Sequence, residues 1–100
     1  MVLISAAFRY GGYIITDHAD DERLNDDVTI QFLEEAIGRD KPKIIEKTPP
    51  QWLILGWGTA TEPLHVKVVI GDEDVTRYRV KTVYRPDPNL WTNNYEKRKT

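Results

Sequence analysis

The chain has 100 residues, a net charge of −2 and no cysteine. This length suits one small domain, and the lack of cysteine excludes disulfide frameworks, thiolate zinc sites and cysteine nucleophiles. Hydrophobic residues make up 40% and charged residues 30%, a balance typical of globular proteins. No apolar run is long enough to span a membrane and the start lacks a signal-peptide pattern, so we expect a cytoplasmic protein without membrane contact.

Two helices are predicted in the first half of the chain. The first covers Asp17–Leu24, directly after residues that suit an N-cap. The second covers Val28–Ile37, where apolar residues recur at helical spacing and a glycine follows. Tyr13–Ile15 has strand-forming residues, whereas Val2–Phe8 fits either a short strand or a short helix.

Four strands are predicted in the second half. The clearest is Pro63–Ile70, where every second residue is apolar and the alternate positions bring His65 and Lys67 to the opposite face. Such a strand belongs in a sheet that is covered on one face and open on the other. The remaining strands are predicted over Lys43–Lys47, Trp52–Trp57 and Tyr78–Tyr84. An acidic turn is predicted at Gly71–Asp74.

The last of these strands has two mixed faces. Tyr78, Val80, Thr82 and Tyr84 alternate with Arg79, Lys81, Val83 and Arg85. Alternation alone does not decide which of the two faces joins the core.

Helices followed by strands predict an α+β fold. We expect two N-terminal helices packed on one face of a mainly antiparallel sheet of four strands, or five if Tyr13–Ile15 joins it. We predict one domain over residues 1–100, with residues 1–12 and 92–100 peripheral or flexible.

Charge is distributed unevenly along the chain. Asp17–Asp40 contains nine acidic residues and two arginines, whereas Arg77–Thr100 contains seven basic and two acidic residues. This asymmetry favours an acidic helical side and a basic sheet side, although solvated surface charge can also segregate without any specific role.

Several motifs together resemble a bacterial family catalogued as domain of unknown function 4258. They are I-T-D-H-A-x-x-x-R-L at Ile15–Leu24, P-L-H-V at Pro63–Val66 and V-Y-R-P-D-x-x-x-W at Val83–Trp91. The resemblance spans Ile15–Trp91 and implies a layout similar to RelE-like and MqsR-like toxins. It further implies a metal-independent endoribonuclease that cleaves mRNA and a cognate antitoxin protein as partner. Two departures are that His18 and its following arginine are one residue further apart than in the commonest form, and that the next helix lacks the usual second basic residue.

Cleavage of RNA without a metal needs a proton acceptor, a proton donor and cations near the phosphate. Histidine suits either proton role because its pKa lies near 6.5, and arginine and lysine suit the phosphate. The resemblance implies roles for both histidines, since both lie in its motifs. We therefore expect His65, His18 and Tyr84 to be catalytic and Lys67, Arg85 and Arg79 to bind RNA.

Other interpretations of these residues remain open. Each histidine could serve a structural role, and Arg23 could pair with Asp20 or Asp27 to hold the helices together. Both histidines with Asp17 or Asp21 would offer acceptable metal ligands, but no spacing makes them converge, and we expect no metal. Nor do we expect a cofactor, because no phosphate loop or dinucleotide motif is present. A non-catalytic protein-interaction module on the same scaffold is the alternative function.

Overall fold

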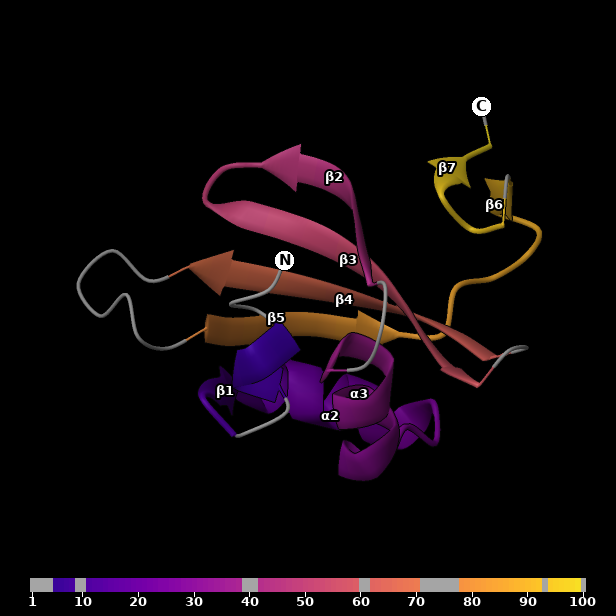
Figure 1. Ribbon diagram of the computed structural model, residues 1–100. Helices are drawn as coiled ribbons and strands as arrows, with labels where there is room; N and C mark the ends of the chain where they lie inside the picture. The colour runs from indigo at the N-terminus through magenta and orange to yellow at the C-terminus, as the bar shows by residue number, and fades with distance from the viewer. Residues whose placement is uncertain are drawn as a thin grey trace.

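The computed structural model describes residues 5–8, 11–38, 42–59, 62–70, 78–92 and 94–99. It confirms the predicted α+β architecture, with helices on one side of a mainly antiparallel sheet (Figure 1). The elements in chain order are β1 (Tyr13–Ile15), α2 (Asp17–Asn25), α3 (Ile30–Gly38), β2 (Lys43–Thr48), β3 (Gln51–Thr59), β4 (Glu62–Ile70), β5 (Tyr78–Tyr84), β6 (Trp91–Thr92) and β7 (Lys97–Arg98). Residues 5–8 form a further helical turn.

Five strands form the main sheet in the order β1-β5-β4-β3-β2. Strands β2 to β5 pair antiparallel with their neighbours in sequence, and β1 pairs parallel with β5. The N-terminal strand therefore joins the sheet as a fifth, edge strand. The acidic turn predicted at Gly71–Asp74 lies outside the described residues. Strands β6 and β7 pair only with each other and form a separate small ribbon.

Threonine side chains cap the starts of both helices. Thr16 Oγ1 accepts a hydrogen bond from the Ala19 N–H at 3.2 Å, and Thr29 Oγ1 accepts one from the Phe32 N–H at 3.0 Å. Between the helices, Asp27 has a φ of 56°, a left-handed conformation that aspartate tolerates better than most residues. Each helix is nine residues long, and within the described part of the chain no helix is long and apolar enough to cross a membrane.

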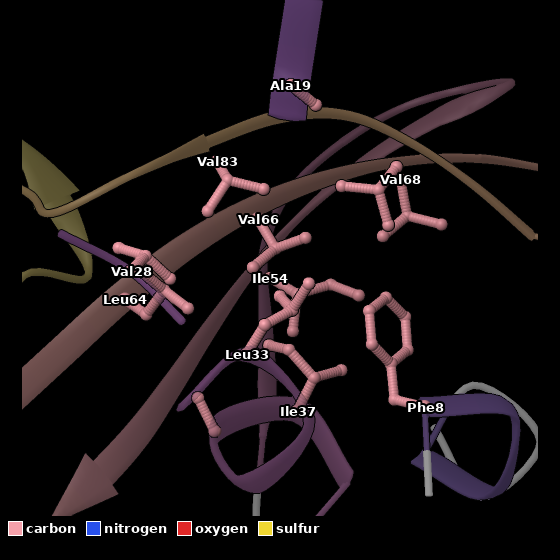
Figure 2. Close-up of a cluster of buried hydrophobic side chains, with 12 residues drawn as sticks. Phe8, Ala19, Val28, Leu33, Ile37, Ile54, Leu64, Val66, Val68 and Val83 are labelled. Atoms are coloured by element: carbon pink, nitrogen blue, oxygen red, sulfur yellow. The ribbon is translucent and has the colours of Figure 1, made fainter. Parts of the chain in front are cut away.

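The hydrophobic core lies between the helices and one face of the sheet, which we call the inner face (Figure 2). Strand β4 is central in the sheet, and its inner face meets α3 across this core. Burial of each such aliphatic side chain contributes about 1.5–3 kcal/mol. The fully buried members include Phe8, Val28, Leu33, Ile37, Ile54, Leu64, Val66, Val68, Val80 and Val83.

Alternation fails in β5 because the pairing with β4 contains a bulge. The register shifts between Lys67 and Val68, so that Val80 and Val83 both face the core. The prediction that Val80 shares a face with Thr82 and Tyr84 is therefore wrong. The extra residue in β5 turns the end of the strand over, and it brings Tyr84 to the face that points away from the helices.

Gly56 allows α3 to lie unusually close to the sheet. A Cβ atom at this position would lie 2.2 Å from the Ala36 carbonyl oxygen and 2.9 Å from the Ile37 side chain. Because the first of these neighbours is backbone, it cannot move aside without displacing the helix. A side chain at residue 56 is thus incompatible with the observed packing of α3.

We expect Gly56→Ala to lower the free energy of unfolding by about 1–3 kcal/mol, the usual cost of overpacking a core. Gly12→Ala is the matched control, since its Cβ would meet Ala7 atoms only at 3.5 Å or more, an ordinary contact distance. Urea unfolding followed by circular dichroism measures both. Equal losses in the two variants would contradict the close packing of α3 on β3.

Candidate functional site

The outer face of the sheet, which points away from α2 and α3, gathers polar and aromatic side chains. In β4 it carries His65 and Lys67. Leu64, the residue before His65, points into the core, and successive residues of a strand point to opposite faces. Tyr84 of β5 and Leu55 of β3 lie directly opposite His65. Directly opposed residues share one face of an antiparallel pair, so these side chains form a row across three strands.

Both ring nitrogens of His65 are hydrogen-bonded. Nδ1 lies 3.0 Å from the Tyr84 hydroxyl and Nε2 lies 2.9 Å from the Tyr95 carbonyl oxygen. A carbonyl oxygen can only accept, so Nε2 carries the hydrogen and donates to Tyr95. In the neutral ring Nδ1 is then an acceptor, and Tyr84 donates its hydroxyl proton to it. The geometry thus fixes the tautomer of the imidazole.

The surroundings of His65 favour its neutral form. The residue is completely buried, at 0% exposure. Burial lowers its pKa, and this effect outweighs the opposing influences of the hydrogen bond to Tyr95 and of the Glu46 carboxylate. Burial likewise raises the pKa of Tyr84. Near neutral pH, therefore, the phenol keeps its proton and the imidazole is uncharged.

Residues 91–92 and 94–99, which we call the C-terminal cover, contribute to the burial of His65. The Trp91 ring stands edge-on to the imidazole, with centroids 4.3 Å apart and an interplanar angle of 84°. The Tyr95 ring packs in the same manner on Trp57, at 5.9 Å and 70°. The cover lies on the side of the sheet opposite to α2 and α3, as the position of β6 and β7 in Figure 1 indicates.

Two ion pairs attach the cover to the edge strand β2. Arg98 binds both carboxylate oxygens of Glu46, with Nε–Oε2 at 2.7 Å and Nη2–Oε1 at 3.2 Å. Its guanidinium also lies over the Trp91 ring, 4.7 Å from the centroid. Lys43 pairs with Glu96. Within the segment predicted to be peripheral or flexible, residues 92–100, these contacts join Glu96 and Arg98 to the sheet.

The carboxylate of Glu46 is held in its ionised form. The hydrogen bond from Arg98 lowers the pKa of Glu46 more than burial raises it, and the nearby charge of Lys67 lowers it further. Glu46 is therefore under the electrostatic influence of Arg98, Lys67 and His65. Together with Tyr84 these four residues form a cluster, here called the outer-face cluster, drawn from β2, β4, β5 and β7.

The structure brings together only some of the residues that the sequence suggested for catalysis. His65, Tyr84 and Lys67 share the outer-face cluster. His18 lies on α2, on the other side of the sheet, where its side chain is 71% exposed and pairs with Glu22 at 3.4 Å. The two imidazoles therefore do not meet in one site, and the interpretation that they act together is wrong.

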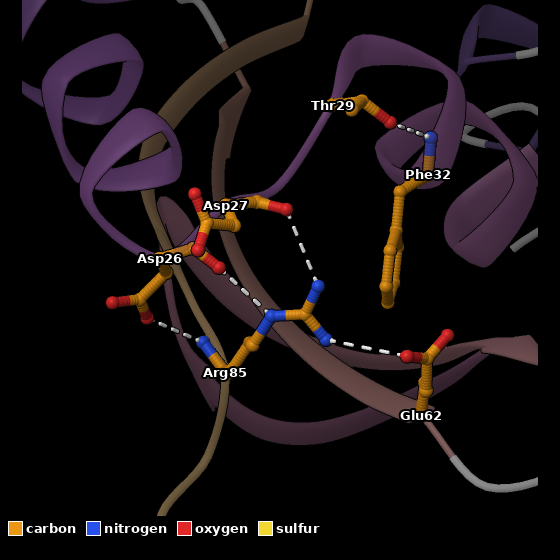
Figure 3. Close-up of polar contacts among 6 residues, drawn as sticks. All are labelled: Asp26, Asp27, Thr29, Phe32, Glu62 and Arg85. Atoms are coloured by element: carbon orange, nitrogen blue, oxygen red, sulfur yellow. Dashed lines mark hydrogen bonds and ion pairs between the residues drawn. The ribbon is translucent and has the colours of Figure 1, made fainter.

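Arg85 has a structural position on the helical side (Figure 3). Its Nε donates to the Asp26 carbonyl oxygen at 2.8 Å, and Nη2 donates to the Asp27 carbonyl at 3.3 Å. Its guanidinium lies 4.6 Å from the centre of the Phe32 ring, and Glu62 lies 3.9 Å from Nη1. These contacts connect the end of β5 to the turn between the helices, so Arg85 is not a member of the outer-face cluster.

Two arginines remain: Arg79, from the predicted RNA-binding set, and Arg23, from the structural alternatives. Arg79 is exposed on the outer face, directly opposite Val69, and lies near the start of β5, whereas Tyr84 is at its end. Arg23 donates to Asp20 Oδ1 at 2.7 Å and to the Val28 carbonyl oxygen at 3.1 Å. Arg23 therefore has the structural role that the sequence left open, because its contacts hold the two helices together.

Sequence reasoning missed Glu46 and Arg98. Strict alternation places Glu46 on the same face as Ile44, which packs against the core. A register shift between these two residues turns Glu46 to the outer face instead. For Arg98, a basic segment near the chain end gave no indication of a partner in β2. Neither residue had a signal in the local pattern.

No other part of the described structure offers an obvious chemical site. Over the described ranges, no group of three or more histidine or acidic side chains is arranged to hold a metal ion. A hollow of about 210 Å³ lies at the junction of α2 and α3. Its lining contains no histidine and consists of Arg23, Leu24, Asp27, Val28 and Thr29.

Comparison with known proteins gave one result. A family model described as Domain of unknown function (DUF4258) matches residues 12–85. The match includes α2, α3, β2 to β5 and His65, and it ends before the C-terminal cover. No curated protein and no solved structure matches the chain.

We expect the free energy of unfolding to fall as the pH is lowered from about 6.5 to 5. The folded-state pKa of His65 is below that of the unfolded chain, so the unfolded state takes up the proton first, and stability increases with pH over this window. The slope should not exceed about 1.4 kcal/mol per pH unit. Urea unfolding at several pH values measures it. His65→Gln should remove the slope and His18→Gln should retain it, and a slope unaffected by His65→Gln would contradict the assignment.

We expect Arg85→Lys to destabilise the protein by about 1–3 kcal/mol, because lysine cannot reproduce the forked donation to two carbonyl groups. Arg79→Lys, at an exposed position of β5, should change stability by less than about 0.5 kcal/mol. Thermal unfolding compares the two variants. Similar effects would argue against a structural role specific to Arg85.

Proposed function

The chain belongs to the family Domain of unknown function (DUF4258), and from its outer-face cluster we propose that it is a metal-independent endoribonuclease. The wider proposal is that it is a toxin of the RelE-like kind, controlled by an antitoxin. The observation that carries the proposal is the convergence of an imidazole, a carboxylate and an ammonium group on one sheet face. These are His65, Glu46 and Lys67, which come from two strands, and Glu46 is under the electrostatic influence of the other two.

The charge distribution supports RNA as the substrate. The segment Asp17–Gly38, which includes both helices, carries eight carboxylates and one arginine. The outer face and the cover carry exposed or half-buried cations, so a polyanion is attracted to this side and repelled from the other. The cations on this side include Lys43, Lys67, Arg79, Lys97, Arg98 and Lys99.

The cluster contains suitable groups for cleavage by the neighbouring 2′-hydroxyl. Glu46, ionised near neutral pH, takes the proton of the 2′-hydroxyl, whose oxygen then attacks the adjacent phosphorus. A bound phosphodiester is a negative charge beside His65 and favours the imidazolium form, which gives its proton to the departing 5′-oxygen. Lys67 stabilises the charge of the pentavalent phosphorus. The products are a 2′,3′-cyclic phosphate and a free 5′-hydroxyl, and the reaction consumes no water or metal.

Tyr84 serves this mechanism as a positioning residue. Its hydroxyl donates to Nδ1 of the neutral ring and can instead accept from Nδ1–H when the ring is protonated. The bond therefore persists in both protonation states and keeps Nε2 directed toward the outside of the sheet.

A non-catalytic protein-interaction module is the second candidate, and the burial of His65 favours it. At 0% exposure, with both nitrogens hydrogen-bonded, the imidazole connects β4, β5 and the cover as a structural element would. On this interpretation the outer face binds a protein and cuts no RNA.

We expect purified protein to cleave single-stranded RNA in EDTA, and Glu46→Gln to reduce the rate at least about 100-fold through loss of the base. Because Arg98 binds the Glu46 carboxylate, the assay includes Arg98→Ala as well as the wild type. Glu46→Gln is made in both backgrounds. His18→Gln, on the opposite side of the sheet, is the matched control and should cleave as its parent does. Gel electrophoresis with detection of the cyclic phosphate measures cleavage.

Two outcomes of this assay would reject the nuclease proposal. One is that neither the wild type nor Arg98→Ala cleaves RNA, with or without divalent ions, while circular dichroism shows both to be folded. The other is cleavage that is insensitive to Glu46→Gln. Either result would leave the interaction module as the function that the structure supports.

A further inference from the structure

The C-terminal cover makes the kinds of contact that a short stretch of RNA would make with the same residues. The carboxylate of Glu96 pairs with Lys43, as a phosphate would. The Tyr95 carbonyl oxygen accepts a hydrogen bond from His65 Nε2 at 2.9 Å, as a phosphate oxygen would. The Tyr95 ring packs on Trp57, where a base could stack instead. An anion, an acceptor and an aromatic ring are thus presented together.

The cover is attached to the sheet in a way that permits release. It forms no strand pairing with the five-stranded sheet, and its own ribbon consists of two residues in each strand. Its ion pairs are solvent-accessible: the Arg98 side chain is 59% exposed and the Lys43 side chain 62%. Exposed ion pairs contribute little to stability, and segments held by few buried contacts open most readily.

We propose that the C-terminal cover is an internal occupant of a binding site for single-stranded RNA, and that it must lift before RNA can bind. The inference rests on the proposed function, since it identifies the substrate class and the control of the same site. Lifting the cover exposes the Trp57 ring and the His65 Nε2–H group. It also frees Lys43 from Glu96 and Glu46 from Arg98, so the groups of the cluster become available in one movement.

Single-stranded nucleic acid fits these groups better than a duplex does. In the covered protein, aromatic rings of side chains fill the site. Only an unpaired base can turn out of its strand and take the place of such a ring. The cations of the outer face then follow the backbone of the strand. A protein segment that presents an aromatic ring and a carboxylate, as Tyr95 and Glu96 do in the cover, is the competing occupant, and it is treated below as an outcome of the test.

The test compares Arg98→Ala with Lys97→Ala in the full chain. Both variants remove one positive charge from the cover, but only Arg98 binds Glu46 and lies over Trp91. The probe is a hexanucleotide of 2′-O-methyl adenosine, which has no free 2′-hydroxyl and cannot be cut by the proposed mechanism. Binding is therefore measured separately from cleavage, by fluorescence anisotropy.

We expect Arg98→Ala to bind the hexanucleotide about 10-fold more tightly than the wild type does, despite its lost positive charge. Lys97→Ala should bind no more tightly than the wild type. In NMR titrations the chain offers only two imidazoles. The pKa of His65 should rise toward its ordinary value in Arg98→Ala alone, because the ring gains access to water and loses the nearby positive charge of Arg98. The signal of exposed His18 should be the same in all three proteins.

The results separate this inference from the proposed nuclease function. If neither binding nor the His65 titration differs between Arg98→Ala and Lys97→Ala, the cover is not a removable occupant, whatever the cleavage assay shows. If His65 becomes accessible and the hexanucleotide binds but natural RNA stays intact, the cover is confirmed as a removable occupant and the nuclease proposal is rejected. If Arg98→Ala instead binds a synthetic peptide of residues 88–100 and not the hexanucleotide, the site is a protein interface and the RNA assignment is overturned.

Discussion

The central strand β4 is covered on both faces, and the arrangement of the remaining structure follows from this constraint. On the inner face, Leu64, Val66 and Val68 are fully buried under the helices. On the outer face, His65 is equally buried, but its cover is a short ribbon attached by side chains. One face is thus sealed by a continuous apolar core, while the other is closed by an imidazole with two hydrogen bonds, aromatic edges and exposed ion pairs.

The elements of the fold could largely be predicted because their signals are local. A capping residue before α2 and strict alternation in β4 are properties of neighbouring residues, and the structure places a helix and a strand there. The predictions of which face a residue occupies failed where the register between two paired strands shifts. Bulges near Ile44 in β2 and opposite Lys67 in β5 change the face of every residue beyond them. A bulge depends on the partner strand, so the sequence of one strand does not reveal it.

The candidate site was predictable only in part, for a related reason. His65, Lys67 and Tyr84 follow from a strand with one polar face and its neighbour. Glu46 reaches the cluster through a bulge, and Arg98 reaches it across 52 residues of chain. His18 drew attention as one of two histidines, yet the helix that carries it packs on the opposite face of the sheet from His65. Chemical type identified suitable residues, but tertiary placement decided which of them meet.

The burial of His65 also couples the position of the cover to the protonation of the site. Under the cover the pKa of the imidazole is lowered, so the covered form binds a proton less readily than an uncovered form in which water reaches the ring. By linkage, a proton on His65 favours the uncovered form, and removal of the cover favours the proton. The charged groups that act on the ring, Glu46 from β2 and Arg98 from β7, pair with each other in the covered form. Lifting the cover removes Arg98, which lowers the His65 pKa, and leaves Glu46, which raises it. The same movement that would admit a ligand would therefore make the imidazole easier to protonate, as its proposed role as the acid requires.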